Sequence, residues 1–371
     1  ILDTADLKCW GDDYNGQAGD GSAIPDRSLP PSTAIDLGTG RTAVAVSAGM
    51  YHVCAILDNG DLKCWGGDQY GQLGDGGTSH SSSTQLTAPS SNPIDLGSGR
   101  TAVAVSAGGW HTCAILDNGD LKCWGRDQYG QLGDGGTNHG SSTYIAAPSS
   151  NAIDLGTGRT AVAVSAGYQH TCALLDNGDV KCWGLDGAGQ LGDGGTSHSL
   201  STHTTSPPTI PINLGTGRTA VAISAGVAHT CAILDNGDLK CWGYGEWGQL
   251  GYGSTTDTYT PSSSAINLGS GRTAVALSAG GYHTCVILDN GDVNCWGQSH
   301  FGQVGDGGGT GYPTYVTSPL TTPIDLGTGR TAASLSGGNY HTCVILDNGG
   351  MKGWGRDTKG QGGTGPVEHT A

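Results

Sequence analysis

The feature that most constrains the fold of this chain is an internal repeat. The tripeptide Cys-Trp-Gly, once degenerate as Gly-Trp-Gly, places a tryptophan at positions 10, 65, 124, 183, 242, 296 and 354. A full unit reads IDLGTGRTAVAVSAG, two variable residues, HTCAILDNGDLKCWG, four variable residues, GQLGDGGT and a Ser/Thr/Pro-rich stretch. Repeats of this kind are typical of solenoids and propellers, in which each unit buries its apolar surface against the next.

Each unit is expected to form strands and turns only. TAVAV alternates small and branched residues, HTCAIL and DLKCW flank the turn signal Asp-Asn-Gly, and we expect a fourth strand in the PxxIDLG segment. No stretch shows the 3.6-residue period of a helix. The 68 glycines among 371 residues fall at fixed places in the unit, where they mark turns.

Three or four short strands, repeated seven times, predict an all-β fold, a seven-bladed β-propeller. We expect one propeller domain to span residues 1–371. Its units are expected at about 1–34 (a partial unit), 35–93, 94–152, 153–211, 212–265, 266–323 and 324–371.

The pattern SAGxxHTCAILDNGDLKCWGxDxxGQLGDG resembles the repeat of the regulator of chromosome condensation family, and it covers essentially the whole chain. The cysteines and the CWG tripeptide resemble the secreted bacterial branch most. The resemblance implies a seven-bladed propeller. It implies less about function, because the fold carries exchange factors, inhibitors, adhesins and scaffolds.

Ten of the 12 cysteines form pairs that are ten residues apart. In Cys54-AILDNGDLK-Cys64, a three-residue Asp58-Asn59-Gly60 loop puts the two cysteines opposite each other, whereas a two-residue turn puts them on opposite faces. We therefore expect five disulfides in preference to free thiols or a metal site, and hence an extracellular or cell-surface location. The pairs are Cys54 with Cys64, Cys113 with Cys123, Cys172 with Cys182, Cys231 with Cys241, and Cys285 with Cys295.

Cys9 and Cys343 remain without a partner in this scheme. The position opposite Cys9 precedes Ile1, and the position opposite Cys343 is Gly353. Seven hairpins are expected against six GRTAVAV strands, so the first blade lacks its opening strand. A missing upstream segment, completion by the tail from Gly365 to Ala371, and a strand donated by a neighbouring molecule all explain this.

Residues that recur in every unit are expected to be structural. We expect the histidine of SAGxxH to position the blade by bonding to backbone. We expect the arginine of GTGRT to form a turn or an inter-blade salt bridge to an aspartate of the hairpin or of GDG, and the CWG tryptophan to serve blade packing in preference to ligand stacking. No phosphate loop, Ca²⁺ nonapeptide or nucleophile motif is present. We therefore expect no enzyme activity, no cofactor and no metal ion.

Charge limits the partners. The chain holds 16 Lys and Arg against 32 Asp and Glu, a net charge of −16, which disfavours nucleic acid and the exchange factor that the family name suggests. No apolar run approaches the ~20 residues of a membrane span. The Ser/Thr/Pro-rich stretches are candidates for O-glycosylation, and no N-x-[ST] sequon occurs.

The informative positions are those that differ between units. The pair after SAG and the four residues after CWG carry aromatic side chains, which are frequent in binding hot spots. These residues form a candidate binding face for a protein or a carbohydrate: Tyr51, Tyr70, Trp110, Tyr129, Tyr168, Trp247, Tyr282, Phe301 and Tyr340. We expect a secreted, non-catalytic structural or interaction propeller that assembles head to tail into a filament or surface layer. The alternative is a soluble inhibitor-like or lectin-like propeller that uses the aromatic face.

Overall fold

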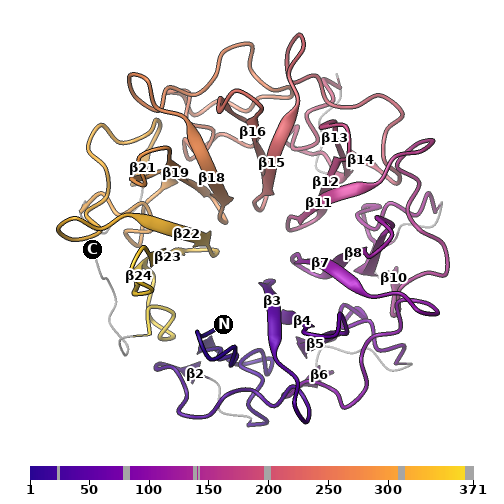
Figure 1. Cartoon of the computed structure of the whole chain (residues 1–371). Helices are drawn as coiled ribbons and strands as arrows, with labels where there is room; N and C mark the ends of the chain where they lie inside the picture. Colours follow the sequence, from indigo (N-terminus) through magenta and orange to yellow (C-terminus); the bar gives the residue numbers. More distant parts are fainter. Residues whose placement is uncertain are drawn as a thin grey trace. The chain divides into compact units, whose positions relative to one another are not determined.

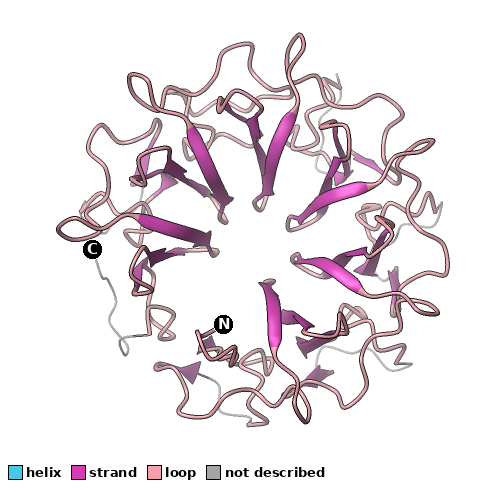
Figure 2. Cartoon of the chain, viewed as in Figure 1, coloured by secondary structure: helices cyan, strands magenta, loops and turns pink. Residues whose placement is uncertain are grey.

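The computed structural model describes residues 1–22, 26–77, 84–136, 140, 143–195, 202–307 and 314–363. The Ser/Thr/Pro-rich stretches, which are candidates for O-glycosylation, lie partly outside these residues. The tail from Gly365 to Ala371 lies wholly outside them. Figure 2 shows strands and loops without a helix in the described part of the chain. Correspondingly, these residues contain no helix of the length and apolarity that a membrane crossing needs.

The repeat forms antiparallel sheets whose strands follow the order of the sequence (Figure 1). The AVAVSA segments form the first strands, which are β3 (Ala43–Ala48), β7 (Ala102–Ala107), β11 (Ala161–Ala166), β15 (Ala220–Ala225), β18 (Ala274–Ala279) and β22 (Ala332–Gly337). The HTCAIL segments form the second strands, which are β4 (His52–Leu57), β8 (His111–Leu116), β12 (His170–Leu175), β16 (His229–Leu234), β19 (His283–Leu288) and β23 (His341–Leu346). The KCWG segments form the third strands, which are β5 (Leu62–Gly67), β9 (Leu121–Arg126), β13 (Val180–Leu185), β17 (Leu239–Gly243), β20 (Val293–Gln298) and β24 (Met351–Gly355).

Four sheets have a short fourth strand, and it does not lie where the sequence predicted it. The fourth strands are β6 (Gln85–Leu86), β10 (Tyr144–Ile145), β14 (His203–Thr204) and β21 (Tyr315–Val316). They pair with the end of the third strand, as Leu86 does with Gly66. The PxxIDLG segment makes a single bond to the start of that strand, from Ile94 N to Leu62 O, and buries Ile94 and Leu96. It is therefore a packed loop.

The prediction of seven blades is wrong. Within the described residues, six sheets have three or four strands, and the first unit forms only a two-stranded sheet of β1 (Gly11–Asp12) and β2 (Asp26–Arg27). The first unit has no GRTAVAV segment and only one of the two hairpin segments, so its sequence cannot build a full blade. For the same reason the structure describes six hairpins, whereas we expected seven.

The hairpins have the predicted three-residue loop. Gly60 N donates to Leu57 O and Leu57 N donates to Asp61 O, so Asp58, Asn59 and Gly60 form the turn. The turn places Gly60 at φ +82°, a left-handed conformation that favours glycine. Ile56 then pairs with Leu62, and Cys54 with Cys64.

The chain divides into two compact units. The first comprises Ile1–Asp176, Trp183–Leu185 and His203–Thr209, and the second comprises Asn177–Cys182, Asp186–Thr202 and Ile210–Ala371. The same packing recurs in both. In the first compact unit, the fully buried Trp124 packs with Cys54 and Cys64 of the preceding sheet. In the second compact unit, Trp296 packs with Cys231 and Cys241. The repeated tryptophan thus joins neighbouring sheets within each unit, as predicted.

Candidate functional site

Both variable windows lie at the same edge of each sheet. The residue pair after SAG connects the first strand to the second, and the four residues after CWG follow the third strand. Ala48 pairs with Val53, and His52 pairs with Gly66, so the first strand ends where the second begins and the third ends. We call this the aromatic edge of a sheet. The opposite edge carries the Asp-Asn-Gly turn, and we call it the turn edge.

Repeated polar residues fix the loop that carries each aromatic side chain after CWG. Asp68 Oδ1 accepts a hydrogen bond from Leu73 N at 3.0 Å, and Gln72 Oε1 accepts one from Tyr70 N at 2.8 Å. Asp127 and Gln131 make the corresponding bonds in the next unit of sequence. The spacing D-x-x-x-Q in these two copies therefore holds Tyr70 and Tyr129 in the same local conformation.

In the first compact unit, four of the predicted residues come together. The rings of Tyr51 and Trp110 stack with centroids 4.0 Å apart, and Tyr70 meets Trp110 edge-on at 5.2 Å. Trp110 Nε1 donates a hydrogen bond to the hydroxyl of Tyr168 at 3.3 Å. All four side chains are half-buried, and burial raises the pKa of Tyr51 above its ordinary value. The phenol is therefore neutral at physiological pH, and the cluster offers rings and hydroxyl groups.

Backbone contacts hold the edges of neighbouring sheets in register within this unit. Met50 N donates to Gly108 O at 3.2 Å, and Gly109 N donates to Gly167 O at 3.1 Å. A Cβ on Gly109 would lie 2.4 Å from the ring of Tyr168, so only glycine leaves room for that ring. The small residue before Trp110 is thus part of how the cluster is assembled.

The structure adds a residue that sequence reasoning missed. The guanidinium of Arg126 lies 4.6 Å from the centroid of the Tyr70 ring, a distance at which a cation is attracted to the ring face. Arg126 also bonds Gln128, whose neighbour Tyr129 accepts a hydrogen bond from Gln128 Nε2 at 3.1 Å. Tyr129 contacts His203 at 6.2 Å. Arginine directly after CWG was the available signal.

The second compact unit holds the remaining predicted residues. Tyr282 lies 6.1 Å from Tyr244, and Trp247 meets His300 edge-on at 5.2 Å. Phe301 and Tyr340 are 5.3 Å apart, and Arg356 lies over both rings. The aromatic edge of the second compact unit thus combines its rings with a histidine and an arginine.

Under the aromatic edge, the repeated histidines are buried and neutral. His52 Nε2 lies 2.8 Å from Thr112 Oγ1 of the next sheet, and Thr112 Oγ1 in turn donates to Gln72 O at 2.7 Å. The threonine proton is used in that bond, so His52 Nε2 must donate, and Nδ1 is left without a proton or a partner. Burial lowers the pKa of His52 to about 4 and that of His111 to about 3. The partner is a threonine hydroxyl, whereas we expected backbone.

The turn edge is the same from sheet to sheet. Arg41 Nη1 lies 3.3 Å from Asp58 Oδ2, and Arg272 Nη1 lies 3.3 Å from Asp289 Oδ2. The predicted pairing of arginine with the hairpin aspartate is confirmed, and it lies within one sheet. Both side chains of each pair are more than one-third exposed, so each pair contributes little to stability.

The predicted disulfides are present. Cys54–Cys64, Cys113–Cys123, Cys231–Cys241 and Cys285–Cys295 join cross-strand partners with Cα atoms 4.0 to 4.1 Å apart. Cys172 and Cys182 are disulfide-bonded as well.

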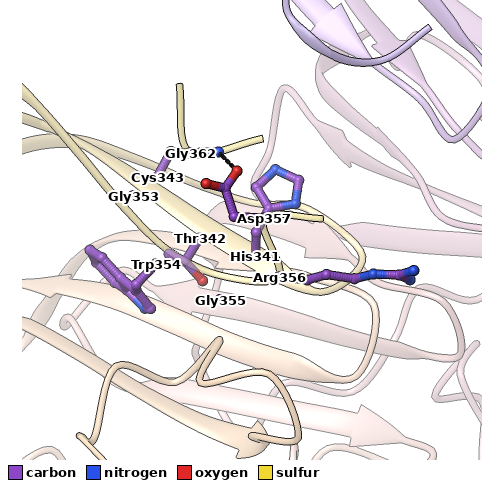
Figure 3. Close-up of a pocket in the computed structure, with 9 residues that line it drawn as sticks. All are labelled: His341, Thr342, Cys343, Gly353, Trp354, Gly355, Arg356, Asp357 and Gly362. Carbon is purple, nitrogen blue, oxygen red and sulfur yellow. Dashed lines mark hydrogen bonds between the residues drawn. The ribbon is translucent and has the colours of Figure 1, made fainter. Parts of the chain in front are cut away.

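Cys9 and Cys343 are free thiols. Figure 3 shows Cys343 beside Gly353, in a hollow that also includes Asp357, which accepts a hydrogen bond from Gly362 N. Burial raises the pKa of Cys343 to about 11 and that of Cys9 to about 12. Both are therefore protonated and weakly nucleophilic at neutral pH.

Repeated four-stranded antiparallel sheets that share buried tryptophans define the class of β-propellers. Residues 1–277 match the family model of the RCC1-like domain, and residues 274–303 and 332–361 match the regulator of chromosome condensation (RCC1) repeat. The chain belongs to this family, and its fold is an all-β propeller of the same type. Its place in a secreted bacterial branch stays a prediction.

Curated relatives support the same assignment. The ultraviolet-B receptor UVR8 of Arabidopsis thaliana is 31% identical over 330 residues, which cover 88% of this chain and 68% of the relative. The E3 ubiquitin-protein ligase HERC2 of Homo sapiens is 29% identical over 71% of this chain, which spans only 5% of that protein.

Solved structures resemble the fold at low identity. Yeast RCC1 (Prp20), solved bound to Kap60, gives a TM-score of 0.79 at 21% identity and covers 98% of this chain and 81% of its own. Human WBSCR16 gives 0.79 at 20% identity, covering 97% and 92%. These likenesses show the fold alone.

Proposed function

We propose that this chain is a non-catalytic, extracellular interaction propeller that binds a protein through the aromatic edge of its first compact unit. The observation that carries the proposal is the contact cluster of Tyr51, Tyr70, Trp110 and Tyr168, half-buried at one edge. Aromatic residues and arginine dominate protein-binding hot spots, and Arg126 lies beside these rings.

The cluster is held in place before any partner arrives. Trp110 is fixed by a stack, an edge contact and a hydrogen bond, and Arg126 is held by Tyr70 and Gln128. Immobilising a side chain at an interface costs about 0.5–1.5 kcal/mol, and rings that are already ordered avoid much of this cost. An ordered aromatic surface therefore favours tight binding per unit area.

The solved relatives support a protein as the partner class. One yeast RCC1 structure is a complex with Kap60, and another is described together with binding to Gsp1p and histones. We carry over only that a propeller of this family binds proteins. The net charge of −16 disfavours an acidic partner such as nucleic acid, because like charges repel.

Two further features support an extracellular, non-catalytic protein. Hairpin disulfides persist in oxidising compartments and are rare in the cytosol. The buried histidines and thiols have pKa values shifted toward their neutral forms, which does not suit acid–base or nucleophilic chemistry at pH 7.

The test compares three immobilised proteins exposed to the extracellular fluid in which the protein occurs. These are the wild type, Trp110→Ala, and the matched control Tyr14→Ala, whose ring is 76% exposed and lies outside the cluster. We expect one protein to be retained by the wild type and the control and at least tenfold less by Trp110→Ala. Equal retention by all three contradicts the proposed surface. If a glycan is retained instead, and Trp110→Ala abolishes its retention, the partner is a carbohydrate and the proposal of a protein partner is wrong.

Head-to-tail self-assembly is a second candidate. The two-stranded sheet of β1 and β2 favours it, because such a sheet offers an edge to which an extended strand of a second copy can add. Sedimentation velocity across a range of concentrations tests it. Growing assemblies support a filament or surface layer, and a single concentration-independent monomer removes this candidate.

A further inference from the structure

A buried lysine recurs in the third strand of the sheets. Lys63 and Lys122 are 7% and 6% exposed, and their ammonium groups donate to Leu37 O and Leu96 O at 3.0 Å. In the second compact unit, Lys240 donates to Leu214 O at the same distance. Each ammonium thus occupies a site whose acceptor is the carbonyl of the IDLG or INLG segment.

One sheet lacks this lysine. Asn294 stands at the position, since VNCW in β20 replaces LKCW, and its side chain is only 3% exposed. Its Oδ1 atom is buried without a hydrogen-bond partner. The equivalent acceptor carbonyl belongs to Leu268, and the adjacent Gly269 has no ammonium beside it. By contrast, a Cβ on Gly38, Gly97 or Gly215 would lie 3.5 to 3.7 Å from a lysine Nζ.

A cavity of about 670 Å³ lies at this place. Its walls include Leu268, Asp292 and Asn294, and the loop from Ser318 to Thr321 closes one side. Gly251, Tyr252 and Gly253 form another wall. They belong to the shortest full repeat of the chain, in which Trp296 follows Trp242 by 54 positions. The missing lysine and the shortened loop therefore coincide at one cavity.

Several polar groups of the cavity accept hydrogen bonds, although hydroxyl and amide donors line it as well. Leu268 O corresponds to the carbonyls that accept an ammonium elsewhere, and Asn294 Oδ1 is an unused acceptor. Thr321 corresponds to Ser91, whose carbonyl lies 3.5 Å from Lys63 Nζ. Asp292 adds a carboxylate, which already accepts a hydrogen bond from Asn290 Nδ2 at 2.7 Å. Arg272 at the same cavity is paired with Asp289 at 3.3 Å. Such a set of acceptors, with a carboxylate among them, favours a cationic donor.

We propose that this cavity binds the primary ammonium group of an alkylamine, which takes the position that lysine fills in the sibling sheets. A four-carbon chain matches the length of a lysine side chain, and the wall residues Leu268 and Leu320 contribute apolar surface for it. The site is separate from the aromatic edge, so it adds a small-molecule site to the proposed protein-binding function.

Calorimetric titration of the purified protein with n-butylammonium tests the proposal, with n-butanol and tetramethylammonium as controls of equal or similar size. We expect saturable binding of n-butylammonium, at least tenfold tighter than either control. Comparable binding of n-butanol would show an apolar hollow and overturn the ammonium site. An absence of saturable n-butylammonium binding would overturn it too.

Variants locate the site. Asn294→Lys supplies the missing ammonium from the chain itself and should abolish n-butylammonium binding. Asn236→Lys adds the same charge to the exposed turn of the preceding sheet and should leave it unchanged. Asn294→Leu, which keeps the size but removes the acceptor, should weaken binding at least tenfold, and it provides the test if Asn294→Lys misfolds. Undiminished binding by a folded Asn294 variant would overturn the proposal.

The source of the amine is settled by a second ligand, Nα-acetyl-lysine methylamide. If it binds as n-butylammonium does, the cavity admits a lysyl side chain of a polypeptide. If only n-butylammonium binds, the cavity takes free amines. Either result supports an ammonium site, provided that Asn294→Lys removes the binding.

Discussion

The turn edge and the aromatic edge of the sheets are built from the same repeat, yet they differ in what varies. At the turn edge, Arg41 with Asp58 and Arg272 with Asp289 keep the same geometry in both compact units. At the aromatic edge, the contact between the buried histidine and a threonine of the next sheet recurs, but the surface side chains differ. Trp110 contacts three tyrosines, whereas the contacts of Trp247 include His300 and Tyr315. Repeated positions hold the sheets, and the positions between them differ from sheet to sheet.

Among the predictions, the largest loss of stability should come from acid, which acts on the buried histidines that recur in the sheets. Burial lowers the pKa of His52 and His170 to about 4, and of His111 and His283 to about 3, while an unfolded histidine titrates near 6.5. Above about pH 6.5 these histidines are neutral in both the folded and the unfolded chain. Between about pH 6.5 and the folded pKa, they take up protons only in the unfolded chain. Each such histidine therefore removes about 1.4 kcal/mol of stability per pH unit between about 6.5 and its folded pKa. Urea unfolding at about pH 7 and pH 5 measures this loss. His111→Gln should reduce it, and an unchanged slope would contradict the role of His111.

Two tryptophans distinguish the repeated core contacts from the variable surface contacts in their effect on stability. Trp124 is fully buried and donates to Gln72 O, so Trp124→Ala should cost about 3–5 kcal/mol of unfolding free energy. Trp110 is half-buried, and Trp110→Ala should cost about 1 kcal/mol. Chemical denaturation of both variants makes the comparison. Equal losses would mean that Trp110 contributes as much to the stability of the fold as Trp124.

The hairpin disulfide that is missing from the last sheet can be introduced. Gly353 pairs with Cys343, and a Cβ on Gly353 would lie 3.3 Å from Cys343 Sγ. Gly353→Cys should form a sixth hairpin disulfide and stabilise the protein by about 2–3 kcal/mol. Thiol titration should then find one free cysteine where the wild type has two, with Gly353→Ala as the control. Three reactive thiols in the folded variant would show that the last hairpin does not share the register of the others.

The turn edge should respond least. Arg100 and Asp117 are 38% and 37% exposed at a distance of 3.2 Å, so Arg100→Ala should lower stability by less than about 1 kcal/mol. Thermal unfolding at low and high salt measures it. A loss larger than this would show that the pair of Arg100 and Asp117 contributes substantially to the stability of the fold.

The hairpins were predictable because their signals are local. Asp58-Asn59-Gly60 and the spacing from Cys54 to Cys64 leave one register that puts both cysteines on one face. The fourth strand was misplaced because Ile94 and Leu96 are apolar like strand residues, whereas they pack into the core from a loop. The blade number was wrong because CWG was counted as a blade even where the preceding strands are absent.

The aromatic windows were found from sequence, but their grouping was not. Nothing local to Trp110 shows that Tyr51 and Tyr168, more than 50 positions away on either side, contact it; that depends on how sheets pack in register. Asn294 was visible as the break in a series of lysines, but the buried acceptor set around it appears only when the IDLG segment folds back onto the third strand.

The disulfides lie within single hairpins, and their partners are ten residues apart. In a chain that crosses a membrane from its N-terminus, each pair would emerge almost together and before the next pair arrives. Sequential emergence would favour neighbours over the many wrong pairings open to 12 cysteines. The repeat would then oxidise blade by blade, in the order in which it is made.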